Sequence, residues 1–118
     1  MTNFELFTLM YFSLGTALEE HKDDKQLLQY TTELNPFVWD TETSADPSFY
    51  ERFCRFMDDK TIGDDYGYSL AHEFIEQEEY YKDMGKYFLM TSKDEYIKAA
   101  KEYLKDPHKG DGRKRSSF

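Results

Sequence analysis

The chain has 118 residues, 39% of them hydrophobic and 18% aromatic, which is enough for one domain with a single core. Its net charge is −9, and residues 1–104 alone hold 22 acidic and 10 basic side chains, a net of −12. A body this acidic repels nucleic acid and anionic lipid and attracts basic proteins. We therefore expect a basic protein partner, and neither nucleic acid nor a membrane.

The cysteine content and the first residues bear on localisation. A single cysteine, Cys54, leaves no internal disulfide and gives no sign of an oxidising compartment. No Lys or Arg precedes the apolar segment 4–18, and Glu5 lies early in it, which is unlike a signal peptide. The segment is also too short and too polar to span a bilayer. We expect a cytoplasmic protein.

The first helix is predicted over residues 4–21. Thr2 and Glu5 have the spacing of a capping box, and apolar residues lie on nearly all sides of the segment. A helix with this pattern is buried, so we expect it at the centre of the fold. Asp23 or Asp24 can cap a second helix directly after it.

Proline marks the end of the second helix and the start of the third. The second helix stops before Asn35-Pro36, because a residue preceding proline avoids helical angles. Residues 35–46 are predicted as a loop; Phe37-Val38-Trp39 could form a short strand, but no β partner is evident. Asp46, followed by Pro47, is a strong helix start.

A fourth helix is expected from about Asp65 to about Tyr81, after a break marked by Gly63 and Gly67. The type of the following short segment, 86–90, is left open.

The last helix is the most clearly bounded of the set. Ser92 and Glu95 form a second capping box, which opens a helix over residues 92–104. Asp106-Pro107 stops this helix, and a polar, basic segment follows it.

These elements predict an all-α fold, a compact bundle of four or five helices. Strand signals are lacking, since the chain has one valine and three isoleucines. We expect a single acidic helical domain over residues 1–104 and a basic tail over 105–118, either disordered or loosely docked. The expected core combines the first helix with one set of apolar side chains: Phe53, Phe56, Phe74, Ile75 and Ile97.

The acidic stretch from Asp58 to Glu79 first suggests a calcium loop. Asp58 and Gly63 match positions 1 and 6 of a helix–loop–helix calcium site. Lys60 and Ile62 would then occupy ligand positions 3 and 5, and neither side chain can bind calcium. We therefore expect no metal here.

An acid–base or zinc site is the second interpretation. His72 and Glu76 share a helix face, but the chain has no HExxH motif and only two other histidines. It also lacks a nucleophile elbow and a glycine-rich phosphate loop between a strand and a helix. We expect no catalytic residue and no cofactor, with an enzyme based on His72 kept as an alternative.

The third interpretation is an exposed acidic surface that binds a partner. Helical geometry separates Leu70, Phe74 and Ile75 from the carboxylates of the fourth helix. Glu78 is the exception, because it falls with the apolar half; either the helix ends near Gln77 or Glu78 reaches outward. The predicted partner-binding residues are acidic and aromatic: Asp64, Asp65, Tyr66, Tyr68, Glu73, Glu76, Glu79, Tyr80 and Tyr81.

The sequence thus favours a small acidic binding protein without enzymatic activity. The specific expectation is an inhibitor or immunity-type antagonist of a basic toxin or nuclease, an inference from size, charge and the lack of a catalytic motif. A structural or regulatory helical subunit of a larger complex is the alternative.

Overall fold

The computed structural model describes residues 1–106 and confirms the all-α class, with helices and no strand in that part of the chain. The helices are α1 (Asn3–Glu20), α2 (Lys25–Leu34), α3 (Pro47–Met57), α4 (Tyr68–Glu76), α5 (Met84–Phe88) and α6 (Lys93–Leu104). All five expected helices are present, and α5 is a sixth in the segment whose type was open. The predicted tail, 105–118, lies outside the described residues from position 107 onward.

The helix starts are fixed by the side chains that the sequence indicated. At α1 the Glu5 amide donates to Thr2 Oγ1 at 3.1 Å, and the Thr2 amide donates to Glu5 Oε1 at 2.7 Å. Ser92 and Glu95 form the second capping box, at α6. Asp24 accepts hydrogen bonds from the first amides of α2. These caps satisfy amides that have no partner inside their own helix.

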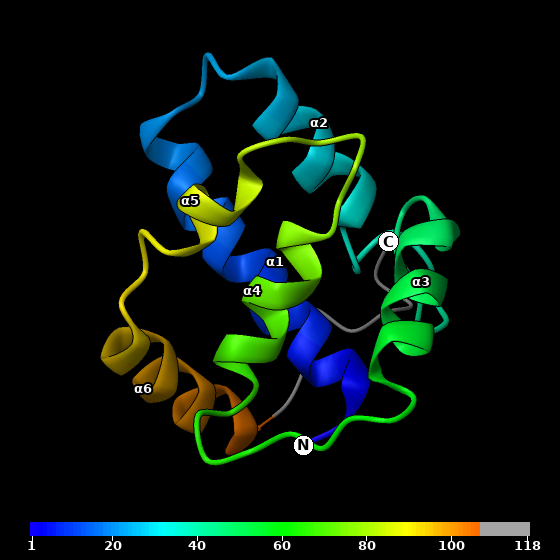
Figure 1. Cartoon of the computed structure of the whole chain (residues 1–118), viewed down its shortest axis with the longest axis vertical. Helices are drawn as coiled ribbons and strands as arrows, with labels where there is room; N and C mark the ends of the chain where they lie inside the picture. The colour runs from blue at the N-terminus through cyan, green and yellow to red at the C-terminus, as the bar shows by residue number, and fades with distance from the viewer. Residues whose placement is uncertain (107–118) are drawn as a thin grey trace.

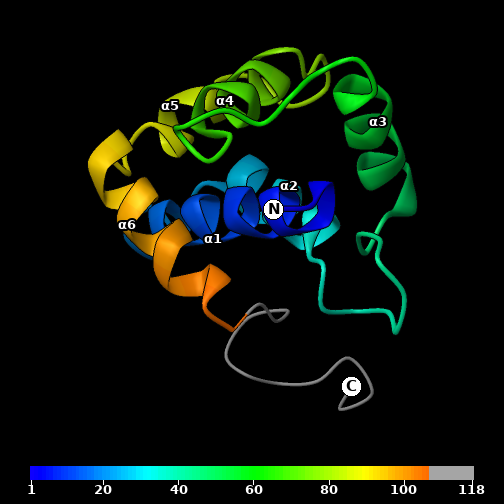
Figure 2. The ribbon, with the colours of Figure 1, turned by 90° about the horizontal axis from the view of Figure 1, so that it is seen from below.

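Helix α1 lies at the centre of the molecule and contacts α2, α3, α4 and α5. Figure 1 shows it crossing behind α4 and α5, and Figure 2 shows α4 and α5 covering one side of it, with α3 and α6 to its right and left in that view. The central position follows from the apolar residues on nearly all its sides. No helix among the described residues is long and apolar enough to cross a membrane.

The core contains the side chains that helical spacing predicted. Phe53, Phe74 and Ile75 are buried in it, and Phe56 and Ile97 pack against it with partial exposure. Aromatic rings meet edge to face across the helices, as between Phe53 and Phe74 at 5.0 Å.

Helix α4 is shorter than predicted at both ends. The backbone of Tyr66 and Gly67 is left-handed, with φ of 55° and 83°, so α4 starts at Tyr68 rather than at Asp65. It ends at Glu76, with Gln77 as its C-cap, instead of continuing to Tyr81. The first of the two alternatives for Glu78 is therefore correct: the helix ends before this residue and the chain turns.

The loop between α2 and α3 holds no strand. Phe37 is buried against Tyr11, with ring centroids 5.5 Å apart, and the Ala45 amide donates to the Asn35 carbonyl at 2.9 Å, which joins the two ends of the loop. Trp39 is about half exposed, and its Nε1 donates to the Ala45 carbonyl at 3.2 Å.

Candidate functional site

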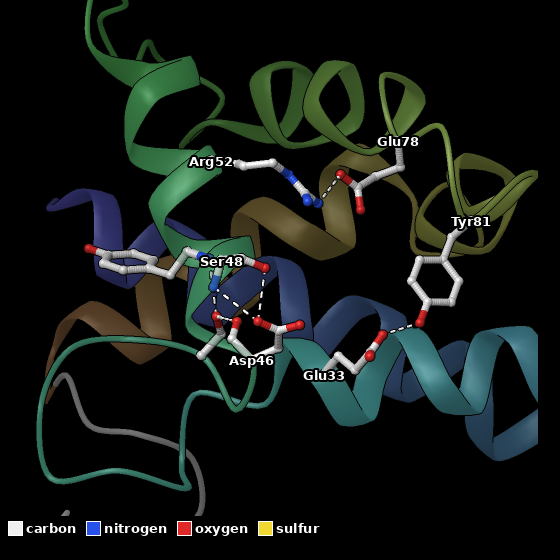
Figure 3. Close-up of polar contacts among 8 residues, drawn as sticks. Glu33, Asp46, Ser48, Arg52, Glu78 and Tyr81 are labelled. Atoms are coloured by element: carbon white, nitrogen blue, oxygen red, sulfur yellow. Dashed lines mark hydrogen bonds and ion pairs between the residues drawn. The ribbon is translucent and has the colours of Figure 1, made fainter.

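A cleft of about 640 Å³ opens between α2, α3 and the segment that follows α4. Figure 3 shows polar side chains reaching into it from three directions: Arg52 from α3, Glu78 and Tyr81 from the segment after α4, and Glu33 from the end of α2. Its lining is acidic and aromatic: Gln29, Glu33, Asp46, Ser48, Phe49, Arg52, Phe56, Phe74, Gln77, Glu78, Glu79, Tyr80 and Tyr81. A concave site with a few convergent polar groups is where binding is expected.

An ion pair between Arg52 and Glu78 forms one wall of the cleft. Arg52 Nη2 donates to Glu78 Oε1 at 2.7 Å, and the guanidinium carbon lies 4.5 Å from the centre of the Phe49 ring. The side chain of Glu78 is only 6% exposed, whereas that of Arg52 is 40% exposed. Burial raises the pKa of Glu78 despite the opposing effect of Arg52.

The second oxygen of Glu78 is buried without a hydrogen-bond partner among the described residues, and so is the hydroxyl of Tyr30. The two groups nevertheless interact electrostatically. Burial, and then the neighbouring Glu78 carboxylate, raise the pKa of the Tyr30 hydroxyl well above its usual value. The same contact with the Tyr30 hydroxyl acts to lower the pKa of Glu78, so the two buried groups partly compensate one another.

Two further carboxylates at the cleft are held in place by this chain's own donors. The Tyr81 hydroxyl donates to Glu33, and burial followed by this bond raises the pKa of Tyr81. Asp46 caps α3, accepting from the Ser48 amide at 3.1 Å and from the Ser48 hydroxyl at 2.8 Å. Carboxylates fixed in this way lose little conformational freedom when a ligand binds.

The predicted partner-binding residues divide into three groups in space. Glu79, Tyr80 and Tyr81 line the cleft. Glu73 and Glu76 are exposed on α4. The remaining four, Asp64, Asp65, Tyr66 and Tyr68, belong to the turn and first residue at the opposite end of α4.

Three residues of the group at the start of α4, Asp65, Tyr66 and Tyr68, have contacts that hold the local structure. Asp65 accepts hydrogen bonds from the amides of Gly67 and Ser69, each at 3.0 Å, and these bonds outweigh the effect of burial and lower its pKa. The hydroxyl of Tyr68 donates to the Thr91 carbonyl at 2.8 Å. Their contacts hold the turn before α4 against α6 and the residues that precede it.

Of the two tyrosines after α4, only Tyr80 is free to act as a surface anchor. The side chain of Tyr80 is 78% exposed, and its ring meets that of Tyr81 edge to face at 5.0 Å. Tyr81 is 2% exposed and belongs to the core cluster, so only its hydroxyl end lines the cleft. The two neighbours differ because the chain turns after Gln77 and places one ring inward.

His72 and Glu76 form a pair apart from the cleft. His72 Nε2 lies 3.0 Å from Glu76 Oε1, and the imidazole stacks on Phe88 with centroids 6.3 Å apart. His72 is not among the residues that line the cleft. No group of three or more potential metal-ligating side chains occurs in residues 1–106.

Sequence reasoning missed most of the polar lining of the cleft, including Glu33, Asp46, Ser48, Arg52 and Glu78. The sequence does contain one signal for the Arg52–Glu78 pair, which is the position of both charges on apolar helix faces. Arg52 follows Phe49 by three residues and precedes Phe56 by four, so it lies on an apolar helix face, as Glu78 does by helical spacing. Two opposite charges on apolar faces suggest an ion pair. Because 26 residues separate them, the sequence alone does not indicate that they are partners.

The fold and cleft define an acidic, all-α protein with a concave site of net negative charge. Comparison of the chain with protein-family models, with curated proteins and with solved structures gives no match.

Proposed function

We propose that this protein is a non-enzymatic binding protein that attaches to a basic macromolecule, as an inhibitor or immunity-type antagonist of a toxin or nuclease. The observation that carries the proposal is the charge of the cleft: four carboxylates, those of Glu33, Asp46, Glu78 and Glu79, face one guanidinium that is already paired. A concave acidic site favours a basic group from a partner. The proposal places the protein in the cytoplasm, where its free Cys54 stays reduced.

The wider surface supports the same kind of partner. Residues 1–104 carry a net charge of −12, and Glu73 and Glu76 extend the acidic surface along α4. Charge of this size speeds the encounter with a basic protein, and the exposed ring of Tyr80 offers contact area once the encounter has occurred.

The enzyme alternative has less support. His72 and Glu76 are neighbours on an α4 face, outside the cleft, and among residues 1–106 no group of three His, Cys, Asp or Glu side chains forms around them. A general acid or base needs a concave place for a substrate.

The test starts with capture from the native cell lysate at low salt, followed by binding kinetics with the captured protein. Changing Glu73, Glu76 and Glu79 together to Gln should slow association by roughly tenfold at low salt and weaken its salt dependence. Tyr80→Ala should instead raise the dissociation rate.

A control variant keeps the same change in net charge. Glu19, Glu20 and Glu102 are exposed and lie outside the cleft, so their joint replacement by Gln should slow association less. Capture of acidic proteins only, or a partner indifferent to salt and to the first triple variant, would refute the proposal.

One observation favours the alternative of a helical subunit in a complex. Val38 and Trp39 are adjacent, and their side chains are 43% and 48% exposed. Binding that is lost in Trp39→Ala but unchanged in the acidic triple variant would support that alternative.

A further inference from the structure

A second hollow of the surface lies on α1, apart from the cleft. It has a volume of about 670 Å³, and all the residues that line it belong to α1: Tyr11, Phe12, Gly15, Thr16, Glu19 and Glu20. We call it the α1 groove. A Cβ added at Gly15 would meet nothing within 4 Å, so in the part of the chain that the structure describes no other segment packs over the middle of the groove.

The two ends of the α1 groove differ in chemistry. At one end the ring of Phe12 meets the ring of Tyr103 on α6, with centroids 6.0 Å apart. At the other end Glu19 and Glu20 are exposed, and their carboxylates form no ion pair with any residue of 1–106. A segment that fits this groove must therefore bring positive charge to its acidic end.

The remainder of this chain has that charge. Residues 107–118 hold one acidic side chain, Asp111, and four basic ones: Lys109, Arg113, Lys114 and Arg115. Residues 1–104 carry a net charge of −12, so the two parts of the chain attract each other. A second copy of the chain is a poorer occupant of the groove, because it would bring a like net charge of −9.

The end of α6 lies where a segment entering the groove has to start. The contact between Tyr103 and Phe12 places the last turn of α6 beside the aromatic end of the groove, and the described chain ends shortly afterwards at Asp106. Along α1, the distance from Phe12 to Glu20 is about 12 Å. The seven residues from Asp106 to Arg113 can span up to about 23 Å, so the basic residues can reach the acidic end with length to spare.

We propose that residues 107–118 dock in the α1 groove of the same chain, with the basic residues 113–115 beside Glu19 and Glu20. Because the segment is tethered next to the groove, its effective concentration there is on the order of millimolar, and weak pairs between exposed charges are sufficient to hold it. This inference goes beyond the proposed function and does not depend on it, since the groove and the cleft share no residue.

The test uses the full chain with a nitroxide spin label close to the basic residues. Ser117→Cys provides the attachment site, and Cys54→Ser removes the native cysteine. The label broadens the nuclear magnetic resonance signals of amides near it. The amides of Phe12, Gly15 and Thr16 should lose more intensity than those of α4, and the loss should decrease when sodium chloride is raised from about 20 to 500 mM, because salt screens exposed charges.

Variants of the labelled chain assign the contacts. Glu19→Gln together with Glu20→Gln should lower the equilibrium constant for docking by about fivefold. Glu51→Gln together with Asp58→Asn makes the same change in charge at exposed positions outside the groove, and should leave docking unchanged. Gly15→Trp should abolish docking because the indole fills the groove, whereas Gly15→Ala adds one methyl group and should preserve it.

The remaining outcomes overturn the inference. A loss of intensity that is even over the molecule, or that is indifferent to salt and to the Glu19 and Glu20 changes, shows that the groove does not hold this segment. A loss that is strongest at residues 78–81 places the segment in the cleft instead. Broadening that persists when the label and the isotope are on different copies assigns the groove to a second copy. Groove amides that ignore the label but shift with a captured basic protein assign it to that partner.

Discussion

Glu78 is a carboxylate that the fold buries although its charge is only partly compensated. It pairs with Arg52 and interacts with the Tyr30 hydroxyl, yet its pKa is raised because loss of water outweighs the effect of both groups. Groups of this kind occur most often at binding and catalytic sites, where a ligand or a reaction makes use of them.

Its titration gives a prediction for stability. The pKa of Glu78 is higher in the folded chain than the ordinary value of 4.5, so the folded state favours the protonated side chain. The stability that this protonation contributes is fully present below pH 4.5 and is lost as the pH rises through the pKa of the folded state. Glu78→Gln keeps an oxygen for Arg52 and should change the free energy of unfolding at pH 7 by no more than about 1 kcal/mol.

The measurement is thermal unfolding of both proteins between pH 7 and pH 4.5. The wild type should gain stability relative to Glu78→Gln on acidification, while the effects of all other carboxylates cancel in the difference. A difference that stays constant or reverses would show that burial does not disfavour the Glu78 charge.

Among the helices, α4 depends most on a single backbone position before its first residue. Gly67 has a φ of 83°, and a Cβ at this position would lie 2.5 Å from Cδ1 of the fully buried Leu6. Glycine is therefore required at position 67 for two reasons: the turn is left-handed, and α1 approaches the backbone closely.

Three Gly→Ala changes should separate these effects. Gly67→Ala should lower the free energy of unfolding by roughly 2–4 kcal/mol, because alanine is strained in the left-handed conformation and its Cβ overfills the core beside Leu6. Gly15→Ala, in α1 with nothing within 4 Å of its new Cβ, should stabilise by up to about 1 kcal/mol. Gly85→Ala would meet Glu76 Oε1 at 2.0 Å and His72 Nε2 at 3.2 Å, so it must displace this side-chain pair, and it should destabilise the protein less than Gly67→Ala because the ends of flexible side chains can move.

Urea unfolding of the three variants checks this order. A Gly67→Ala protein as stable as the wild type would contradict the left-handed turn at Gly67 and its close approach to Leu6.

Local signals in the sequence were sufficient for most helix starts, but not for α4 or for the cleft. Asp46 and Ser92 are caps that act within a few residues, so the sequence alone predicts them. The end of α4 depends on a distant residue, because Glu78 turns back to meet Arg52 on α3. Pairing across 26 residues follows from packing, which one sequence does not specify.

The same reason explains why two neighbouring tyrosines differ in exposure. Tyr80 and Tyr81 are adjacent and chemically identical, and only the chain direction after Gln77 makes one exposed and the other buried. Of the predicted contact residues, Glu79, Tyr80 and Tyr81 line the cleft, while Asp65 and Tyr68 hold a turn.

The whole molecule carries a strong excess of negative charge. The net charge of −12 over residues 1–104 makes the folded chain repel itself, because compaction brings the carboxylates closer together. Few ion pairs offset this charge: of those formed among residues 1–106, Arg52–Glu78 is the one that joins residues far apart in the sequence, linking α3 to the segment after α4.

Salt ions that screen the repulsion between these carboxylates should therefore stabilise the folded state. Raising sodium chloride from about 20 to 500 mM should add about 1 kcal/mol to the free energy of unfolding, or roughly 4–8 °C in Tm. Calcium at matched ionic strength should give no further increase, since a saturated specific site would add about 2.7 kcal/mol at 100 times its Kd. Scanning calorimetry measures both effects, and an additional rise with calcium would reveal a cation site.

The central position of α1 has a consequence for the making of the protein. Helix α1 is synthesised before α4 and α5, the helices that cover one side of it, so the apolar side chains on that side stay uncovered until Phe88 has been added. At about 5–20 residues per second, the delay after Glu20 is roughly 3 to 14 s. During that interval the nascent chain exposes the apolar side of α1 that α4 and α5 later cover. Its yield in the cell should therefore respond to chaperone supply and to translation rate, even where the finished protein is stable.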